Sequence, residues 1–212
     1  MDVIKHACAA SKTLALFDFD GTLCNKDSFT GFIFYSLPKR HIVRQGIKIL
    51  PWIQGYYLKL YPAHAMRPRL YAAMFSQANH EHILNQAAQY AEHLMAELNP
   101  SLYEQLQQHQ KRGHEVVLVS ASVDLYLKPV AEKLGVKLIC TETAANDQIL
   151  TGLYQTLDCS GEQKKIRVLE QFNLQDYEHV YAYGNSDEDL AMFELATHHF
   201  MNGQDKCLPE LD

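Results

Sequence analysis

The chain has 212 residues and a formal net charge of −6 at pH 7. That length allows one hydrophobic core with a modest insertion, and the acidic balance argues against nucleic acid as a general partner. Five cysteines, an odd number without a C-x-x-C pair, fit reduced thiols in a cytoplasmic protein better than a disulfide framework or a zinc site. Residues 1–12 contain no long apolar segment, and no run of about 18 apolar residues occurs, so we expect neither a secretory signal nor a transmembrane helix.

An apolar run followed by two carboxylates stands near the start of the chain. Residues 14–17 are typical of a buried strand, and Asp18 and Asp20, two positions apart, would point to one face of an extended chain. These carboxylates repel each other, and the next basic residue is Lys26. A divalent cation such as Mg²⁺, which prefers oxygen ligands, would relieve that repulsion. The simpler alternative is a strand that ends in a polar turn, but the full string DFDGT directly after the strand argues against it.

The segment after this strand changes in character. A helical apolar pattern begins near Phe29 and continues, interrupted by prolines, to about Leu98. We therefore predict an all-helical cap at 29–98, inserted between two parts of a core at 1–28 and 99–212. The cap is somewhat small for a domain that folds alone.

The predicted cap is strongly basic. No Asp or Glu occurs between Asp27 and Glu81. A local positive field attracts anionic ligands to nearby clefts. Residues 42–61 also mix basic with apolar side chains, which would suit contact with an anionic membrane surface; an amphipathic helix packed on its neighbours is the commoner arrangement, and we favour it. The basic residues of the interval are Lys39, Arg40, Arg44, Lys48, Lys59, Arg67 and Arg69.

The rest of the chain alternates between helical and strand patterns. Asn99 and Pro100 are typical of a helix start. Alternation of this kind predicts an α/β, Rossmann-like parallel sheet with helices on both faces. The expected helices are 101–112, 123–134, 161–172 and 190–196. The expected strands are 115–122, 136–140, 180–184 and 198–201, with a hairpin or loop at 147–157.

Polar side chains follow three of the predicted strands. Ligands of such sheets bind outside the carboxyl ends of the strands. If the three strands are neighbours, their polar ends converge on a single site. The groups are Asp18 and Asp20, then Ser120 and Ser122, then Asn185, Asp187 and Asp189.

Four strings occur in the order of the four motifs of the haloacid dehalogenase superfamily of phosphohydrolases, and the resemblance covers almost the whole chain. They are DFDGT from Asp18, the serines from Ser120, the lysine pair 164–165 and GNSDED from Gly184. The helical insertion between the first two motifs is similar to the cap of the phosphoserine-phosphatase-like subclass. The strings SAS from Ser120, LTG from Leu150 and GEQK from Gly161 resemble a branch that includes phosphatidylglycerophosphatase C.

This resemblance implies a Mg²⁺-dependent phosphatase that works through a phosphoaspartyl enzyme. Asp18 would be the nucleophile, Asp20 the general acid and base, and Ser120 a hydrogen-bond partner of a phosphoryl oxygen. Asp20 would also give its backbone carbonyl to the metal. The expected metal ligands are Asp18, Asp20, Asn185 and Asp189, and the expected substrate contacts are Gly21, Asp27, Ala121 and Ser122.

The motif also requires a lysine that balances the phosphoryl charge and keeps the nucleophile ionised. Lys165 has Leu169 and Phe172 four and seven residues further on, in register with an apolar helix face. Lys164 instead fits the Gly-Glu-x-Lys spacing of similar proteins. We assign the catalytic role to Lys165.

The expected substrate is a small anionic phosphomonoester. Phosphoserine phosphatases usually carry Glu in place of Asp27 and Ser-Gly-Gly at motif two, and the cap of phosphatidylglycerophosphatase C is far more apolar than this one. Asn185 stands where related enzymes usually have Asp, which would weaken Mg²⁺ binding. Three alternatives remain: a lipid-phosphate phosphatase at the membrane surface, a receiver-like regulatory module, and an inactive relative. Nothing in the sequence indicates an oligomeric state.

Overall fold

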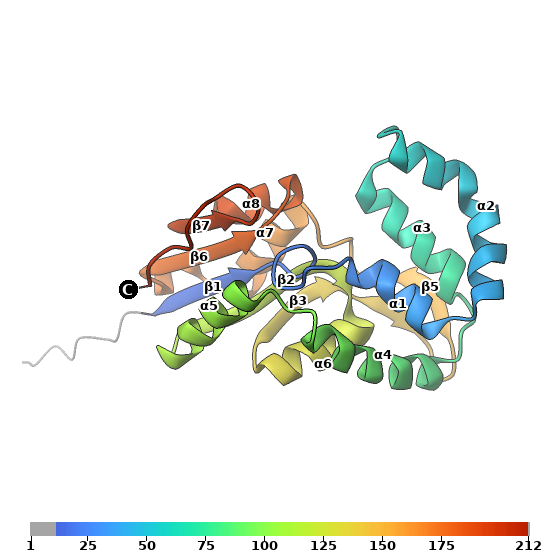
Figure 1. The fold of residues 1–212 in the computed structure, drawn as a ribbon, viewed down its shortest axis with the longest axis horizontal. Helices are drawn as coiled ribbons and strands as arrows, with labels where there is room; N and C mark the ends of the chain where they lie inside the picture. Colours follow the sequence, from blue (N-terminus) through green and yellow to red (C-terminus); the bar gives the residue numbers. More distant parts are fainter. Residues whose placement is uncertain (1–11, 212) are drawn as a thin grey trace, which may run out of the picture.

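The structure is a computed structural model that describes residues 12–211. Cys8 and nearly all of the polar lead-in expected at 1–13 lie outside that range. Within it, five parallel strands form one sheet in the order β3-β2-β1-β6-β7 (Figure 1). The strands are β1 (Thr13–Phe17), β2 (Glu115–Val123), β3 (Lys137–Thr141), β6 (His179–Gly184) and β7 (His198–Met201).

The central strand β1 is buried along its whole length, as expected of a parallel strand covered on both faces. Leu14 and Leu16 pack on one face, with Val168 and Met192 of two later helices. Alternate residues, including Phe17, pack on the other face with helices from either side of β2. The predicted α/β architecture with helices on both faces is therefore confirmed. The helices are α5 (Pro100–Lys111) and α6 (Asp124–Leu134) on the Phe17 face, and α7 (Glu162–Gln171) and α8 (Leu190–Phe193) on the other.

Helix α5 starts where the sequence predicts. The Asn99 side chain accepts hydrogen bonds from the backbone N–H groups of Ser101 and Leu102, and Pro100 occupies the first turn. Two short 3₁₀ turns, Leu174–Asp176 and Asp187–Asp189, flank β6. The second of these belongs to the polar loop that follows the strand.

The insertion between β1 and α5 is helical, as predicted. Helices α2 and α3 project beyond the carboxyl ends of the strands, whereas α1 and α4 lie beside α6 (Figure 1). The ring of Phe32 in α1 contacts the rings of Phe75, Tyr90 and Tyr126, so one apolar cluster joins the insertion to the core. The division into two domains stays a prediction. The helices are α1 (Ser28–Ser36), α2 (Lys39–Tyr57), α3 (Ala63–Phe75) and α4 (His80–Met95).

A two-stranded antiparallel hairpin, β4 (Thr143–Ala145) and β5 (Leu150–Tyr154), supports helix α3. It begins before the predicted excursion at 147–157. The backbone of Leu150 accepts a hydrogen bond from Gln77 N–H and donates one to Ala78. Gly152 has a φ of 81°, and a Cβ there would lie 2.7 Å from the Cβ of Ser76. Only glycine therefore allows this close contact between hairpin and insertion.

We predict that Gly152→Ala destabilises the protein more than Gly203→Ala. Both glycines have a positive φ, but a Cβ on Gly203 meets no atom within 4 Å. Gly203→Ala should cost about 1 kcal/mol from backbone strain alone, or a melting-temperature drop of roughly 2–4 °C for a protein of this size. Gly152→Ala adds a clash of about 1–3 kcal/mol and should lower the melting temperature at least about twice as far. Equal shifts in differential scanning calorimetry would contradict the packing described here.

Candidate active site

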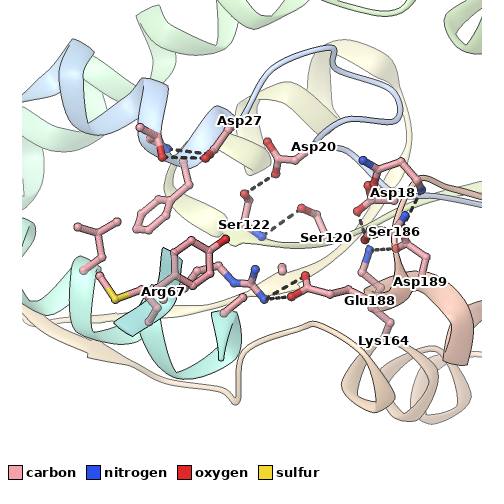
Figure 2. Close-up of a pocket in the computed structure, with 18 residues that line it drawn as sticks. Asp18, Asp20, Asp27, Arg67, Ser120, Ser122, Lys164, Ser186, Glu188 and Asp189 are labelled. Atoms are coloured by element: carbon pink, nitrogen blue, oxygen red, sulfur yellow. Dashed lines mark hydrogen bonds and ion pairs between the residues drawn. The ribbon is translucent and has the colours of Figure 1, made fainter. Parts of the chain in front are cut away.

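The polar ends of three strands meet at one edge of the sheet. Because β1 lies between β2 and β6, the residues that follow these strands surround one cavity of about 260 Å³ (Figure 2). Helices α2 and α3 close it from the cap side. The core contributes Asp18, Asp20, Ser120, Ala121, Ser122, Lys164, Asn185, Ser186, Glu188 and Asp189 to the lining; the insertion contributes Phe29, Thr30, Tyr56, Ala63, Met66, Arg67 and Leu70; Asp27 lies between the two sets.

A buried lysine bridges two of these carboxylates. Lys164 Nζ lies 2.6 Å from Asp18 Oδ1 and 2.5 Å from Asp189 Oδ1, and all three side chains are buried. The second carboxylate oxygen of Asp18 accepts a hydrogen bond from Thr22 Oγ1 at 2.9 Å. The end of β1, the start of α7 and the loop after β6 are thus joined by one cation.

The assignment of Lys165 was wrong. Its side chain is partly exposed and pairs with Glu194, outside the cavity. The register argument relied on Leu169, but Leu169 is exposed, and the buried face of α7 carries Lys164 and Val168. The helix therefore turns the other lysine toward Asp18.

Asp20 has surroundings different from those of Asp18. Its carboxylate accepts a hydrogen bond from Ser28 N–H and another from Ser122 Oγ, both at 2.6 Å. Burial raises the pKa of the Asp20 carboxyl, against these hydrogen bonds, which lower it. Ser122, expected to contact substrate, is thus engaged with Asp20, while Ser120 Oγ accepts the N–H of Ser122.

The loop after β6 is organised by Asp189. Oδ2 of Asp189 accepts the N–H groups of Asn185 and Ser186 at 2.9 and 3.1 Å, and Oδ1 faces Lys164. Both oxygens already have partners from the protein. Asp189 therefore holds the loop in place, and the direct metal contact expected of it from the sequence stays a prediction.

Two further residues were expected to contact substrate, and of these Asp27 lines the cavity whereas Gly21 does not. A Cβ on Gly21 would lie 2.1 Å from Nδ2 of Asn185, so this glycine makes room for the amide. Asp27 also caps helix α1, accepting hydrogen bonds from the N–H and the hydroxyl of Thr30.

The charge balance of the site fits a divalent cation. Burial raises the pKa of Asp18 to about 7, although the Lys164 ammonium opposes this. Burial would lower the pKa of Lys164, but the charges of Asp18 and Asp189 outweigh it and raise that pKa. Lys164 is paired with two carboxylates and a third, Asp20, lies in the same cavity, which leaves an excess of negative charge.

The available donors are oxygens, which suit Mg²⁺. They are the carboxylate of Asp18, the backbone carbonyl of Asp20 and the side-chain amide of Asn185. Within residues 12–211, no three His, Cys, Asp or Glu side chains form a metal-binding group. A cation at this place would therefore depend on the amide and the carbonyl as well as on Asp18.

Sequence reasoning missed the role of Arg67. From helix α3, its guanidinium makes two hydrogen bonds of 2.8 Å to Asp158 and also contacts Glu188. The contact with Glu188 joins the insertion to the loop after β6 within the cavity (Figure 2), and the contact with Asp158 joins it to the segment before α7. The sequence showed Arg67 only as one of seven basic residues, and it is the only one of the seven in the cavity lining, with its charge balanced by two acids.

Comparison with known proteins shows to which family the chain belongs. A family model described as haloacid dehalogenase-like hydrolase matches residues 15–194. The protein CicA of Caulobacter vibrioides is 31% identical over 190 residues, covering 86% of this chain and 82% of its own. A probable phosphatase of Mycobacterium tuberculosis is 25% identical over 205 residues, covering 93% of this chain and 71% of its own.

A solved structure of substrate-bound phosphoserine phosphatase superposes with a TM-score of 0.60 at 20% identity, covering 90% of this chain and 86% of that one. That likeness shows a shared fold. Taken with the family match along most of the sequence, it establishes that this chain belongs to the haloacid dehalogenase-like hydrolases.

Proposed function

We propose that this hydrolase is a Mg²⁺-dependent phosphomonoester phosphatase that forms a phosphoaspartyl intermediate on Asp18. The observation that carries the proposal is the buried contact of Lys164 with Asp18 and Asp189, beside Asp20 in one cavity. Mg²⁺, held by the Asp18 carboxylate, the Asp20 carbonyl and the Asn185 amide oxygen, would supply positive charge beside the phosphoryl oxygens.

The two carboxylates divide the chemistry between them. An oxygen of Asp18 attacks phosphorus, and the bond from phosphorus to the ester oxygen breaks while Asp20 gives that oxygen its proton. A water then attacks the phosphorus of the acyl phosphate and passes a proton to Asp20. The bond from phosphorus to the Asp18 oxygen breaks, so phosphate is released and the Asp18 carboxylate is restored. The raised pKa of Asp20 supports its role as the acid. Lys164 keeps a positive charge next to the nucleophile, and Ser120 lies where it can donate to a phosphoryl oxygen.

The cavity supports a small substrate, because about 260 Å³ is near the lower end of ligand pockets. The only cap cation in its lining, Arg67, is already paired with Asp158 and Glu188. We therefore propose a small phosphomonoester that owes its negative charge to the phosphoryl group. We place the reaction in the cytoplasm, on the sequence argument from the odd number of cysteines.

One observation favours a lipid phosphate as the second candidate. The side chains over the cavity on the cap side include Phe29, Tyr56, Met66 and Leu70, so the leaving group would meet mostly apolar surface. A screen that compares short polar phosphomonoesters with lysophosphatidate decides between these substrates. Preference for the lipid by kcat/KM would replace the leading proposal.

The lysine assignment generates the first functional prediction. Lys164→Met should lower kcat for p-nitrophenyl phosphate with Mg²⁺ by on the order of 100-fold or more, because a buried charge beside the transferred group is lost. Lys165→Met removes the same charge one residue away and should leave kcat within about twofold, because exposed ion pairs contribute little. Equal loss in both variants would contradict the assignment.

The nucleophile has its own test. Brief reaction with ³²P-labelled phosphomonoester, followed by acid quenching, should leave label on the wild-type protein that hydroxylamine removes, as an acyl phosphate requires. Asp18→Asn should carry none and show no turnover above background. Label or Mg²⁺-dependent turnover that persists in Asp18→Asn would rule out Asp18, and a wild type without turnover would favour the regulatory or inactive relative.

The buried charge excess predicts a pH-dependent stability. Because the pKa of Asp18 rises from 3.8 to about 7 on folding, the folded state keeps a proton that the unfolded chain has released. The contribution of Asp18 to the free energy of unfolding therefore decreases as pH rises between about 4 and 7. Without Mg²⁺, Asp18→Asn should melt at a higher temperature than the wild type at pH 8, and the difference should shrink near pH 5.

Calorimetry with and without Mg²⁺ measures this effect. Mg²⁺ should raise the wild-type melting temperature at pH 8 and change that of Asp18→Asn little, because ligands stabilise the state they bind. Asp187→Asn is the matched control, since Asp187 is exposed on the same loop. If Asp187→Asn gains as much stability as Asp18→Asn, the buried charge excess is not the cause.

A further inference from the structure

The outer face of helix α2 carries large apolar side chains that nothing covers. Of its 19 residues only Ile49 is buried, whereas Val43, Ile47 and Tyr57 are 62%, 67% and 78% exposed. The packed amphipathic helix favoured from the sequence would have buried such residues against its neighbours. The side of α2 that carries Ile42, Ile49 and Ile53 packs on the apolar core, as expected, whereas this face does not.

These side chains share one side of the helix. Val43, Ile47, Leu50 and Tyr57 are spaced by four, three and seven residues, which places them on one side of a helix. Further apolar side chains are exposed past the end of α2, where Leu58 and Leu60 are 68% and 79% exposed. We call these six side chains the α2 stripe. Exposed apolar side chains gathered in this way on one part of a surface are typical of an interaction site.

Five cations border the α2 stripe. Within residues 12–211, none of them makes an ion pair with an acidic side chain. All 25 acidic residues of the chain lie outside 28–80. The charge of the molecule is therefore uneven, with positive charge at the end formed by α2 and negative charge elsewhere. The five cations are Lys39, Arg40, Arg44, Lys48 and Lys59, all exposed.

The stripe is separate from the cavity. Tyr56 lines the cavity from α2, and the 3.6-residue period places it on the side of the helix opposite Val43 and Leu50. Helix α2 lies outermost in the insertion, away from the sheet (Figure 1). A partner on the stripe could therefore bind without entering the site proposed above.

We propose that the α2 stripe docks on an anionic lipid bilayer. Apolar side chains on one helix face would enter the boundary between headgroups and acyl chains while the bordering lysines and arginines contact lipid phosphates, as in interfacial helices. The same surface would repel the acidic remainder of the chain, so the molecule would approach the bilayer with α2 facing it. A symmetric dimer through this face is less favourable, because it would bring the two sets of five cations together. The proposal does not depend on the catalytic assignment.

Vesicle co-sedimentation tests the proposal. The wild type should bind vesicles of phosphatidylcholine and phosphatidylglycerol in equal amounts about tenfold or more tightly than pure phosphatidylcholine vesicles, and high salt should remove most of this preference. Arg44→Glu with Lys48→Glu should reduce binding to the anionic vesicles at least about tenfold. Lys111→Glu with Lys206→Glu makes the same charge change at exposed positions outside the insertion and should reduce it far less.

The apolar contribution is tested by Ile47→Ser with Tyr57→Ser, compared with Leu169→Ser at an exposed position of α7. Only the first should weaken vesicle binding at low salt. Hydrolysis of p-nitrophenyl phosphate, or circular dichroism if the chain proves inactive, checks that every variant is folded. Failure of the wild type to bind anionic vesicles, equal loss in the control variants, or a wild-type dimer in light scattering that Ile47→Ser with Tyr57→Ser dissociates would overturn the proposal.

Discussion

The contact of one buried ammonium with two carboxylates determines how this site is built. Lys164, Asp18 and Asp189 come from three distant parts of the chain, and the loss of Lys164 would leave two buried carboxylates without their cation, which is costly. Apolar side chains of similar volume stabilise a core at least as well as a buried ion pair does. The presence of such a pair at the carboxyl edge of the sheet therefore indicates a constraint from chemistry, on which the positions of β1, α7 and the loop after β6 depend.

The insertion completes this site because it is packed into the core. Aromatic contacts join α1 and α4 to α6, the backbone of the β4–β5 hairpin bonds to the segment after α3, and Arg67 spans the cavity to Asp158 and Glu188. These contacts place α3 over the strand ends. They also leave the far side of α2 without packing partners, so the same arrangement that closes the cavity exposes an apolar and basic face.

Local patterns in the sequence were sufficient for most of the fold. The apolar run of β1, the cap of α5 at Asn99 and the polar strand ends required only near neighbours, and parallel strand order then brought Asp18, Ser120 and Asn185 together. The choice of Lys165 as the catalytic lysine failed because it assumed that Leu169 is buried. Leu169 is exposed, and Lys164 and Val168 form the buried face of α7. The roles of Arg67 and Asp189 depend on partners that are distant in sequence or on backbone N–H groups in a loop, and residue types at given spacings do not specify either.

In the reaction we propose, Asp18 accepts a phosphoryl group while a cation is held beside it. A crystal structure grown with Mg²⁺ and beryllofluoride tests this most directly, because beryllofluoride takes the place of a phosphoryl group on a carboxylate. We expect beryllium bonded to a carboxylate oxygen of Asp18, with Mg²⁺ in contact with Asp18 and the Asn185 amide oxygen. An ordered beryllofluoride bound elsewhere, or a metal ion ligated without Asp18, would contradict it.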